Sequence, residues 1–535
     1  MSQPQPGSEV AGAQPAAGEP SGAGGRPPSW KLGVIDACLA AAVGLAVLLV
    51  HDVPYMLHHP FWLDEAWVAD TVRAPLGLTR SLASSTPLGW TVLLRLVPFG
   101  GPQRLRLVPL AFTMLAAAAA YLFGHELRLT RYTTGILTGA AVLLSPAMLV
   151  RDDLKQYTAE AFACILLWLL VARAENQWRL RRVVAIAATT CVGLLFSDTV
   201  IFVGVAAMGS LAIECLATRH WRRLIGLAGA SAGMLAVSLV IYEVLIRPQV
   251  TPTLTAYWAP FYVPRSGSAV SFIGSHLRYL APYLGFRYLV IDLLLALAGI
   301  AALIWLRRFA LAAMLPLTLA VLIGVSAAGQ YPFGDLRTST FWLVTVPLLM
   351  AVAVAAAARW ATAIDRRAPA VITAAALAVW VLATGPYIRS HPLPGENVRS
   401  QVAYLDAHFR RGDVVIVSYA ASYAFAYYYH GADPSFRSDP VTANGHVPAY
   451  PGVPWIVTMT NRRAVDVANA LATAEARIAA EPGGARARIW IIRSHLRPPE
   501  IRAWQRDLAG GRTRTIHVGR EPILLYIPPA RPTAG

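Results

Sequence analysis

Long apolar segments recur along the chain between residues 33 and 387, separated by short polar loops. A helix rises about 1.5 Å per residue, so it needs about 20 apolar residues to cross the hydrocarbon core of a bilayer. We predict spanning helices at 33–53, 105–124, 133–150, 158–173, 183–198, 199–217, 223–246, 286–304, 309–327, 340–358 and 368–387. The pattern therefore predicts an all-α polytopic membrane bundle of about 11 transmembrane helices.

One further apolar segment, Pro87–Phe99, is predicted not to span the membrane. It is bounded by prolines, carries Arg95 near its middle, and would cover only about 20 Å as a helix. An amphipathic helix that lies along the membrane surface fits this pattern better.

The segments on either side of the bundle, residues 31–389, differ from it in composition. Residues 1–30 are mostly Pro, Gly, Ala, Ser and Gln, so we predict a disordered tail there rather than a signal peptide. Residues 390–535 are more polar and contain strand-like runs at Asp413–Tyr419 and Arg488–Arg493, with a helix-like segment at Val465–Ala480. This alternation predicts a small α/β accessory domain.

The composition of the whole chain agrees with a membrane protein. Hydrophobic residues make up 56% and charged residues 14%, with a mean hydropathy of +0.49, whereas soluble domains carry about 25% charged residues. A soluble cytosolic enzyme, a disordered protein and a disulfide scaffold are excluded. The four cysteines all lie in apolar segments, which predicts neither disulfides nor a cysteine-based metal site.

Basic residues exceed acidic residues by 46 to 29, which gives a formal net charge of +17. Cytoplasmic loops of membrane proteins collect Lys and Arg, so this charge does not indicate a nucleic-acid partner. If the N-terminus is cytoplasmic, the inside loops carry Arg128/Arg131, Arg173/Arg179/Arg181/Arg182, Arg219/Arg222/Arg223, Arg307/Arg308 and Arg366/Arg367. We therefore predict a multi-pass protein of the plasma (inner) membrane whose C-terminal domain is extracytoplasmic.

An acidic pair, Asp64 and Glu65, lies in the first predicted outer loop between Trp62 and Trp67. Partial burial beside aromatic rings raises the basicity of a carboxylate, which suits a general base. The alternative interpretation is a solvated acidic pair next to an interfacial aromatic belt.

Two basic elements lie in other predicted outer loops. Arg151 and Lys155 are four residues apart, and Tyr157 follows them, so both cations and the hydroxyl could hold a phosphate. Arg337 closes the segment Gln330–Arg337 just before a predicted span. The alternatives are interfacial anchoring by Tyr and Lys for the first element, and a Pro-Gly turn for the second.

The outer loop at 247–285 is rich in aromatic residues and carries a few hydrogen-bond donors. Trp258 and His276 are candidates for binding a sugar or the acceptor, although an interfacial belt would have the same composition. His276 has no neighbours at metal-ligand spacing, so no metal site is predicted there.

The order of these elements resembles the GT-C superfamily of membrane glycosyltransferases that use polyprenyl-phosphate sugars. This superfamily includes protein O-mannosyltransferases, aminoarabinose transferases and bacterial cell-envelope enzymes. The resemblance covers about residues 33–390: an Asp-Glu loop after the first span, an interfacial helix opening with Pro-Leu, a third span ending at Ser145-Pro146, and Lys155–Tyr157. Tyr331–Arg337 also resembles an outer loop of the bacterial members, whereas Gln156 stands where many members have proline.

The resemblance implies a GT-C-like fold and an inverting sugar transfer from a polyprenyl-phosphate donor in the lipid bilayer to a glycan, lipid or protein acceptor. In this reading Asp64 is the catalytic carboxylate and Glu65 its acidic neighbour. Arg151, Lys155, Tyr157 and Arg337 bind the carrier phosphate. Some members use a divalent cation, and two adjacent carboxylates leave that point open.

Two other functions are compatible with the same phosphate-binding residues. One is a transporter or flippase of a lipid-linked sugar, and the other is a cell-envelope scaffold without catalysis. A transporter is expected to carry polar residues in the middle of its spans and repeat symmetry between its halves, and the sequence displays neither.

Overall fold

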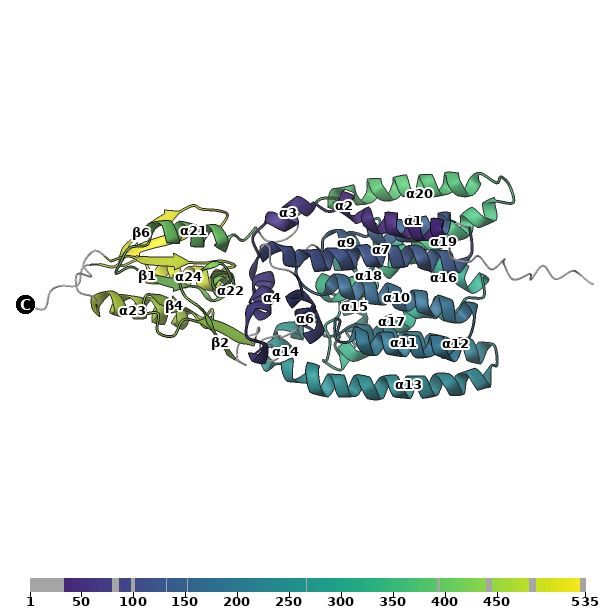
Figure 1. Cartoon of the computed structure of the whole chain (residues 1–535), viewed down its shortest axis with the longest axis horizontal. Coiled ribbons are helices and arrows are strands. Elements are labelled where there is room, and N and C mark those ends of the chain that lie inside the picture. Colours follow the sequence, from purple (N-terminus) through teal and green to yellow (C-terminus); the bar gives the residue numbers. More distant parts are fainter. Residues whose placement is uncertain are drawn as a thin grey trace, which may run out of the picture.

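The computed structural model describes residues 33–78, 86–97, 102–130, 132–151, 153–265, 267–391, 395–438, 445–480 and 487–529. The molecule is elongated, with a helical bundle at one end, a small α/β domain at the other and short helices between them (Figure 1). The tail predicted at residues 1–30 lies outside the described residues.

Among the described residues, helices lie at all the positions predicted to span the membrane. They are α1 (Val34–Leu45) with α2 (Val47–Val50), α7 (Leu107–Leu127), α8 (Thr133–Leu143) with α9 (Pro146–Leu149), α10 (Tyr157–Asn176), α11 (Leu180–Gly193), α12 (Val200–Ala217), α13 (Trp221–Ile241), α16 (Leu289–Trp305), α17 (Phe309–Ala327), α18 (Leu336–Leu343) with α19 (Thr345–Ala361), and α20 (Ala368–Thr384).

Seven of the helices in the described ranges are long and apolar enough to cross a membrane, so the chain is an integral membrane protein but the count of eleven spans is not confirmed. The shorter apolar helices have local causes. Helix α8 ends at the Ser145-Pro146 step because proline fits the first turn of a new helix, α9, and not the interior of an old one. Helix α11 carries two arginines, Arg181 and Arg182, in its first turn, and they shorten its apolar part.

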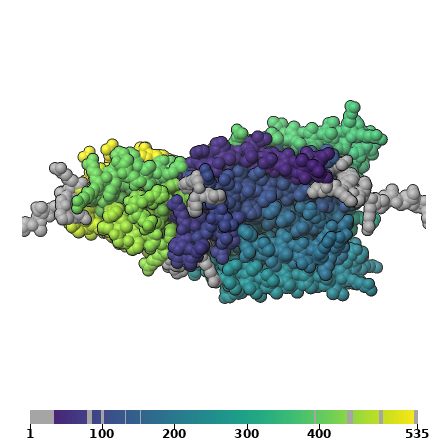
Figure 2. Space-filling model, in the orientation of Figure 1, coloured from purple at the N-terminus to yellow at the C-terminus, as the bar shows by residue number. Residues whose placement is uncertain are grey.

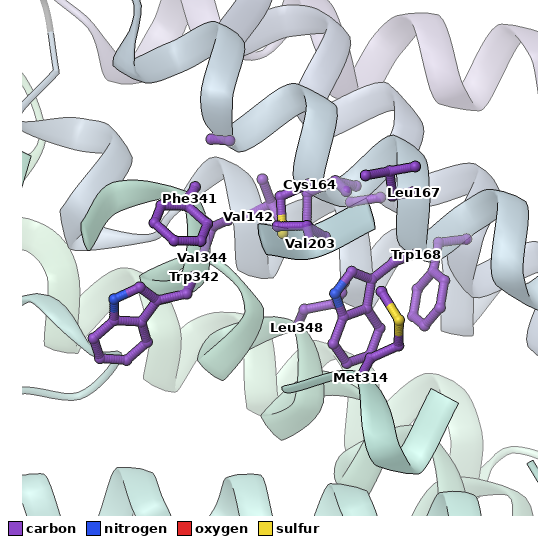
Figure 3. Close-up of a cluster of buried hydrophobic side chains, with 14 of the residues drawn as sticks. Val142, Cys164, Leu167, Trp168, Val203, Met314, Phe341, Trp342, Val344 and Leu348 are labelled. Carbon is purple, nitrogen blue, oxygen red and sulfur yellow. The ribbon is translucent and has the colours of Figure 1, made fainter. Parts of the chain in front are cut away.

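The core of the bundle is formed by side chains from many different helices. Figure 3 shows one region where Trp168 and Cys164 of α10 pack close to Met314 of α17 and Leu348 of α19. All four side chains are buried. These contacts fix the positions of the helices whose ends carry the polar residues described below.

The arginine-rich loops meet at the end of the bundle remote from the α/β domain (Figure 1). Arg173, in the last turn of α10, lies 3.0 Å from Glu126 at the end of α7, and Arg308, before α17, lies 4.0 Å from Glu175. The predicted arginine clusters that fall within the described ranges therefore share one face of the protein, while Arg131 lies outside the described residues.

Short helices form the layer between the bundle and the α/β domain. They are α3 (Val53–His58), α4 (Leu63–Arg73), η1 (Leu76–Leu78), α6 (Leu88–Arg95), η2 (Pro102–Arg106), η3 (Tyr242–Ile246), η4 (Arg247–Gln249), α14 (Pro252–Trp258), η5 (Ala259–Phe261), α15 (Ala269–Leu280), η6 (Ala281–Tyr283) and η7 (Gly385–Tyr387). Helix α6 corresponds to the segment that we predicted not to span. Its Arg95 donates hydrogen bonds to the carbonyls of Thr71 and Ala74 at the end of α4, which places this cation in the layer rather than in lipid.

The α/β domain is built on a five-stranded sheet with the order β4-β1-β5-β7-β6. Strands β4 (Ile456–Thr458), β1 (Val414–Val417) and β5 (Ile489–Ile492) are parallel, and β7 (Ile523–Ile527) and β6 (Arg512–Ile516) continue the sheet antiparallel. The remaining elements are α21 (Val398–His408), α22 (Tyr419–Tyr428), α23 (Ala464–Ala480), α24 (Pro498–Asp507) and the hairpin β2 (Ser435–Ser438)–β3 (His446–Ala449). The predicted strands and helix are confirmed as β1, β5 and α23.

The α/β domain rests on helix α4, which packs against α22 (Figures 1 and 2). Phe61 and Trp67 belong to the same buried hydrophobic cluster as the strands of the sheet. The Phe61 N–H donates to the Tyr428 hydroxyl at 2.8 Å, and the Arg73 guanidinium lies 3.9 Å from the centre of the Tyr427 ring. The domain is therefore held against the part of the chain that carries the acidic pair.

Candidate active site

A cavity of about 240 Å³ lies between the helical layer and the α/β domain. It brings together residues that are far apart in the sequence. Its lining consists of Trp62, Leu63, Asp64, Trp67, Lys155, Tyr157, Leu254, Tyr257, Trp258, Arg337, Tyr419, Arg462, His495 and Arg497. Five of the predicted site residues, Asp64, Lys155, Tyr157, Trp258 and Arg337, are in this lining.

Asp64 lies in the first turn of α4, where a carboxylate is favoured by the positive end of the helix dipole. Its Oδ2 atom is 3.3 Å from a guanidinium nitrogen of Arg337. Arg337 is oriented by Asp335, whose Oδ1 accepts from its backbone N–H at 2.9 Å and from its Nε at 3.2 Å. The same guanidinium donates to the Tyr257 hydroxyl at 3.1 Å. A carboxylate and an oriented arginine thus face the same space.

Lys155 is a buried cation in the wall of the cavity, with only 3% of its surface exposed. Its Nζ lies 3.8 Å from the centre of the Trp67 ring, and among the described residues it forms no ion pair within 4.0 Å. Burial lowers the pKa of Lys155 to about 8, against the opposing effect of the Asp64 charge. A lysine with this environment has hydrogen-bonding capacity left for an anionic ligand.

Glu65 is not part of the lining of the cavity. It is completely buried and forms a two-pronged ion pair with Arg106: Arg106 Nε lies 2.7 Å from Oε1, and Nη2 lies 2.5 Å from Oε2. Its Oε1 also accepts from the Leu154 N–H at 3.1 Å. Burial raises the pKa of Glu65, and the Arg106 charge opposes that rise. The structure therefore places Glu65 where it can position the site rather than contact a substrate.

The contacts of Glu65 connect the two elements that carry Asp64 and Lys155. Glu65 follows Asp64 in the chain, and Leu154 precedes Lys155. The Leu154 carbonyl also accepts a hydrogen bond from Trp90 Nε1 at 3.0 Å, so both backbone polar groups of this residue are fixed. The separation between the Asp64 carboxylate and the Lys155 ammonium is thereby set by buried hydrogen bonds.

Arg151 is near the cavity but is not part of its lining. Its guanidinium is 3.4 Å from Asp153 and 5.5 Å from the centre of the Tyr157 ring. Burial raises the pKa of Asp153, and Arg151 opposes that rise. Of the four residues predicted to bind the carrier phosphate, Lys155, Tyr157 and Arg337 line the cavity. Arg151 lies outside the lining, with its guanidinium over the Tyr157 ring.

Of the two candidates from the aromatic-rich loop at 247–285, only one lines the cavity. Trp258, at the end of α14, lines the cavity, and Arg337 lies 5.4 Å from the centre of its ring. His276 on α15 is outside the lining. Its Nδ1 is 2.9 Å from the Phe272 carbonyl, and its ring lies 3.9 Å from the Phe272 ring. The structure gives His276 a packing role in the loop.

Asp64 and Glu65 do not fit a shared divalent cation. Such ions require about six oxygen ligands, whereas both Glu65 oxygens are engaged by Arg106 and Asp64 is paired with Arg337. Within the ranges that the structure describes, no three His, Cys, Asp or Glu residues are grouped so as to hold a metal ion.

A second cavity of about 160 Å³ adjoins the first and shares Tyr157, Leu254 and Trp258 with it. Its other wall carries Glu160 and Asp198 together with three amide side chains, Gln156, Gln249 and Gln330. Carboxylate and amide oxygens next to aromatic rings are suited to binding hydroxyl groups.

Four lining residues come from the α/β domain and were not among the site residues predicted from the sequence: Tyr419, Arg462, His495 and Arg497. Each follows one of the parallel strands: Tyr419 follows β1, Arg462 follows β4, and His495 and Arg497 follow β5. The carboxyl ends of parallel strands meet at one edge of a sheet, where α/β proteins commonly bind ligands. His495 and Arg497 follow the predicted strand at Arg488–Arg493, which was the available signal, but β4 was not predicted and the strand order was not known.

Comparison with solved structures identifies the architecture. ArnT from Cupriavidus metallidurans in the apo state aligns over 92% of this chain and 97% of its own, with 15% sequence identity and a TM-score of 0.51. The chain has the fold of ArnT. The structure of that ArnT bound to undecaprenyl phosphate matches over the same shares of both chains, with 14% identity and a TM-score of 0.50. The GT-C-like fold expected from the sequence is thereby confirmed.

The arabinofuranosyltransferase AftD from mycobacteria is also similar, with 16% identity and a TM-score of 0.44. The match covers 95% of this chain and 42% of AftD. No protein-family model matches the chain, and no curated protein matches it.

Proposed function

We propose that the protein is a membrane glycosyltransferase that moves a sugar from a polyprenyl-phosphate carrier to the hydroxyl of an acceptor, with inversion at the anomeric carbon. One observation carries the proposal: a single cavity holds the Asp64 carboxylate together with Lys155, Arg337 and the Tyr157 ring. A general base next to cations that can bind a phosphate is the arrangement that this reaction needs. The likeness of the fold to ArnT, solved with undecaprenyl phosphate, supports a lipid carrier.

The reaction is a single displacement. The acceptor oxygen forms a bond to the anomeric carbon while the bond from that carbon to the carrier phosphate oxygen breaks, and its electron pair leaves with the phosphate. Asp64 accepts the proton of the acceptor hydroxyl. The donor phosphodiester carries one negative charge and the departing polyprenyl phosphate gains a second, which Lys155 and Arg337 stabilise. The second cavity, with Glu160 and Asp198, is suited to the hydroxyl groups of the donor sugar.

The function is tested with purified protein and a set of synthetic polyprenyl-phosphate sugars. Release of polyprenyl phosphate that depends on an added acceptor is the expected result. A transporter or flippase would move the donor across a proteoliposome membrane without cleaving it, and a scaffold would do neither. Mass spectrometry of envelope glycans and glycoproteins after gene deletion would then identify the sugar and the acceptor.

We expect the alkaline limit of activity to depend on Lys155. Burial lowers its pKa to about 8, so the cation is present below that pH and is lost above it. The ratio kcat/KM for the donor, which reports on the free enzyme, should fall by about tenfold for each pH unit above 8. Lys155→Arg keeps its charge at high pH, so its profile should lose this limb. An identical limb in both proteins would contradict the assignment.

We also expect the cavity to face away from the cytoplasm, because the arginine clusters lie at the opposite end of the bundle. In a background without the four native cysteines, Arg463→Cys in the α/β domain should react with a membrane-impermeant maleimide in intact spheroplasts. Arg222→Cys, in the first turn of α13, should react only after permeabilisation. The reverse pattern would place the site in the cytoplasm and refute this orientation.

A further inference from the structure

The wall that the α/β domain contributes to the cavity is strongly basic. Arg462, His495 and Arg497 all lie at the edge where the parallel strands β4 and β5 end. Helix α4, whose first turn carries Asp64, lies between this domain and the helical bundle (Figure 1). Two groups of cations from different domains therefore face the same carboxylate.

The two arginines of this wall have no acidic partner within 4.0 Å among the described residues. Arg462 donates one hydrogen bond, to the His495 carbonyl at 3.0 Å, and its guanidinium lies 5.4 Å from the centre of the Tyr419 ring. Burial lowers the pKa of Arg462 and the charge of Arg497 lowers it further, while the charges of Glu500 and Glu396 oppose that lowering. Neighbouring cations that repel each other are stabilised by an anion placed between them.

His495 is held rigidly in this wall. Its backbone has a φ of 50°, a left-handed conformation that is uncommon for residues other than glycine, and its N–H donates to Glu521 at 2.8 Å. Its ring Nδ1 lies 2.6 Å from Glu396 Oε1, and Glu396 Oε2 accepts from the Leu63 N–H at 2.9 Å. The wall is thus tied by a buried carboxylate to the residue that precedes Asp64.

The donor phosphate does not need this second group of cations. Lys155 and Arg337, with Tyr157, come from the membrane-spanning helical part of the protein, whereas Arg462 and Arg497 come from the α/β domain. An acceptor that approaches Asp64 from that side would meet the two arginines first.

We propose that the α/β domain binds the acceptor through an anionic group, a phosphate or a carboxylate, which Arg462 and Arg497 hold while Asp64 receives the proton of a nearby hydroxyl. This inference rests on the proposed function and adds the class of acceptor to it. Arginine is suited to such a role because its planar guanidinium can bind both kinds of anion through two parallel hydrogen bonds. His495 is a positioning residue, which shapes the wall through its contact with Glu396.

The test uses full-length protein, a labelled polyprenyl-phosphate sugar and an envelope extract from a strain that lacks the gene, separated on an anion exchanger. We expect label in the retained, anionic fraction. Phosphatase treatment of that fraction should abolish labelling if the group is a phosphate, and carbodiimide coupling to a neutral amine should abolish it if the group is a carboxylate. Label only in the neutral fraction would overturn the inference and leave the proposed function standing. No label in any fraction would overturn both.

Variants then assign the anion to the two arginines. Arg462→Gln/Arg497→Gln should raise the KM for the retained fraction by about 10- to 100-fold, with little change in the KM for the donor. Arg497→Gln alone removes an exposed side chain and serves if the double variant unfolds. Arg463→Gln is the matched control, because that neighbouring arginine is exposed and paired with Asp466 outside the cavity. The assignment would be refuted if Arg497→Gln and the double variant both kept the wild-type KM for the acceptor. It would also be refuted if only the KM for the donor rose.

Discussion

Replacement of Asp64 by asparagine should reduce the rate of sugar transfer by about 10²- to 10⁴-fold. The amide has nearly the same size as the carboxylate and can still contact Arg337, but it does not accept the proton of the acceptor hydroxyl. Binding of the donor should be maintained, because Lys155 and Arg337 remain and one negative charge near the phosphate is removed. The loss should therefore be in kcat rather than in the KM for the donor. Single-turnover assays in detergent or nanodiscs would measure it directly.

A matched control for this variant is Asp52→Asn. Asp52 caps helix α3 by accepting from the Tyr55 N–H at 3.1 Å, and it lies outside the cavity lining. Asparagine caps helices as well as aspartate, so this variant should keep both its fold and its activity. Near wild-type transfer by a well-expressed Asp64→Asn protein would remove Asp64 from the mechanism.

The bundle could be predicted from the sequence because burial in a membrane leaves a long and repetitive apolar signal. The same signal does not determine how long each helix is. The Ser145-Pro146 step divides one predicted span into α8 and α9, and the terminal arginines shorten α11. The alternation of arginine-rich loops predicts that Asp64 and Lys155 lie on the same side of the bundle, whereas their placement in one cavity is seen only in the structure.

Details of the candidate site depend on contacts between distant residues, and these could not be predicted. Glu65 and Asp64 look equivalent in the sequence, and only the position of Arg106, which is 41 residues away from Glu65, separates their roles. Arg151 and Lys155 also look alike, but Asp153 pairs with the former and the Trp67 ring contacts the latter. For Arg462 and Arg497, the missing information was the order of the strands in the sheet.

Replacement of Arg106 by methionine should lower the free energy of unfolding by about 3–5 kcal/mol. Arg106 lies at the end of η2 and binds Glu65 as well as the carbonyls of Met56 and His59, the latter at 2.8 Å. Without the guanidinium, the burial that raises the pKa of Glu65 is no longer opposed. The protein must then bury an unpaired carboxylate or take up a proton, and either change costs stability. Denaturant titration in detergent micelles would measure the difference.

Two further variants separate the ion pair from a general effect of losing an arginine. Arg104→Met removes an exposed arginine from the same short helix and should change the free energy of unfolding by less than about 0.5 kcal/mol. Glu65→Leu/Arg106→Met removes both charges and should recover part of the stability lost in Arg106→Met, because no buried charge is left without a partner. It should not recover transfer, because the Leu154 N–H loses its acceptor and the loop that carries Lys155 is no longer fixed to the helix that carries Asp64. Full transfer activity in that double variant would show that Glu65 has no positioning role.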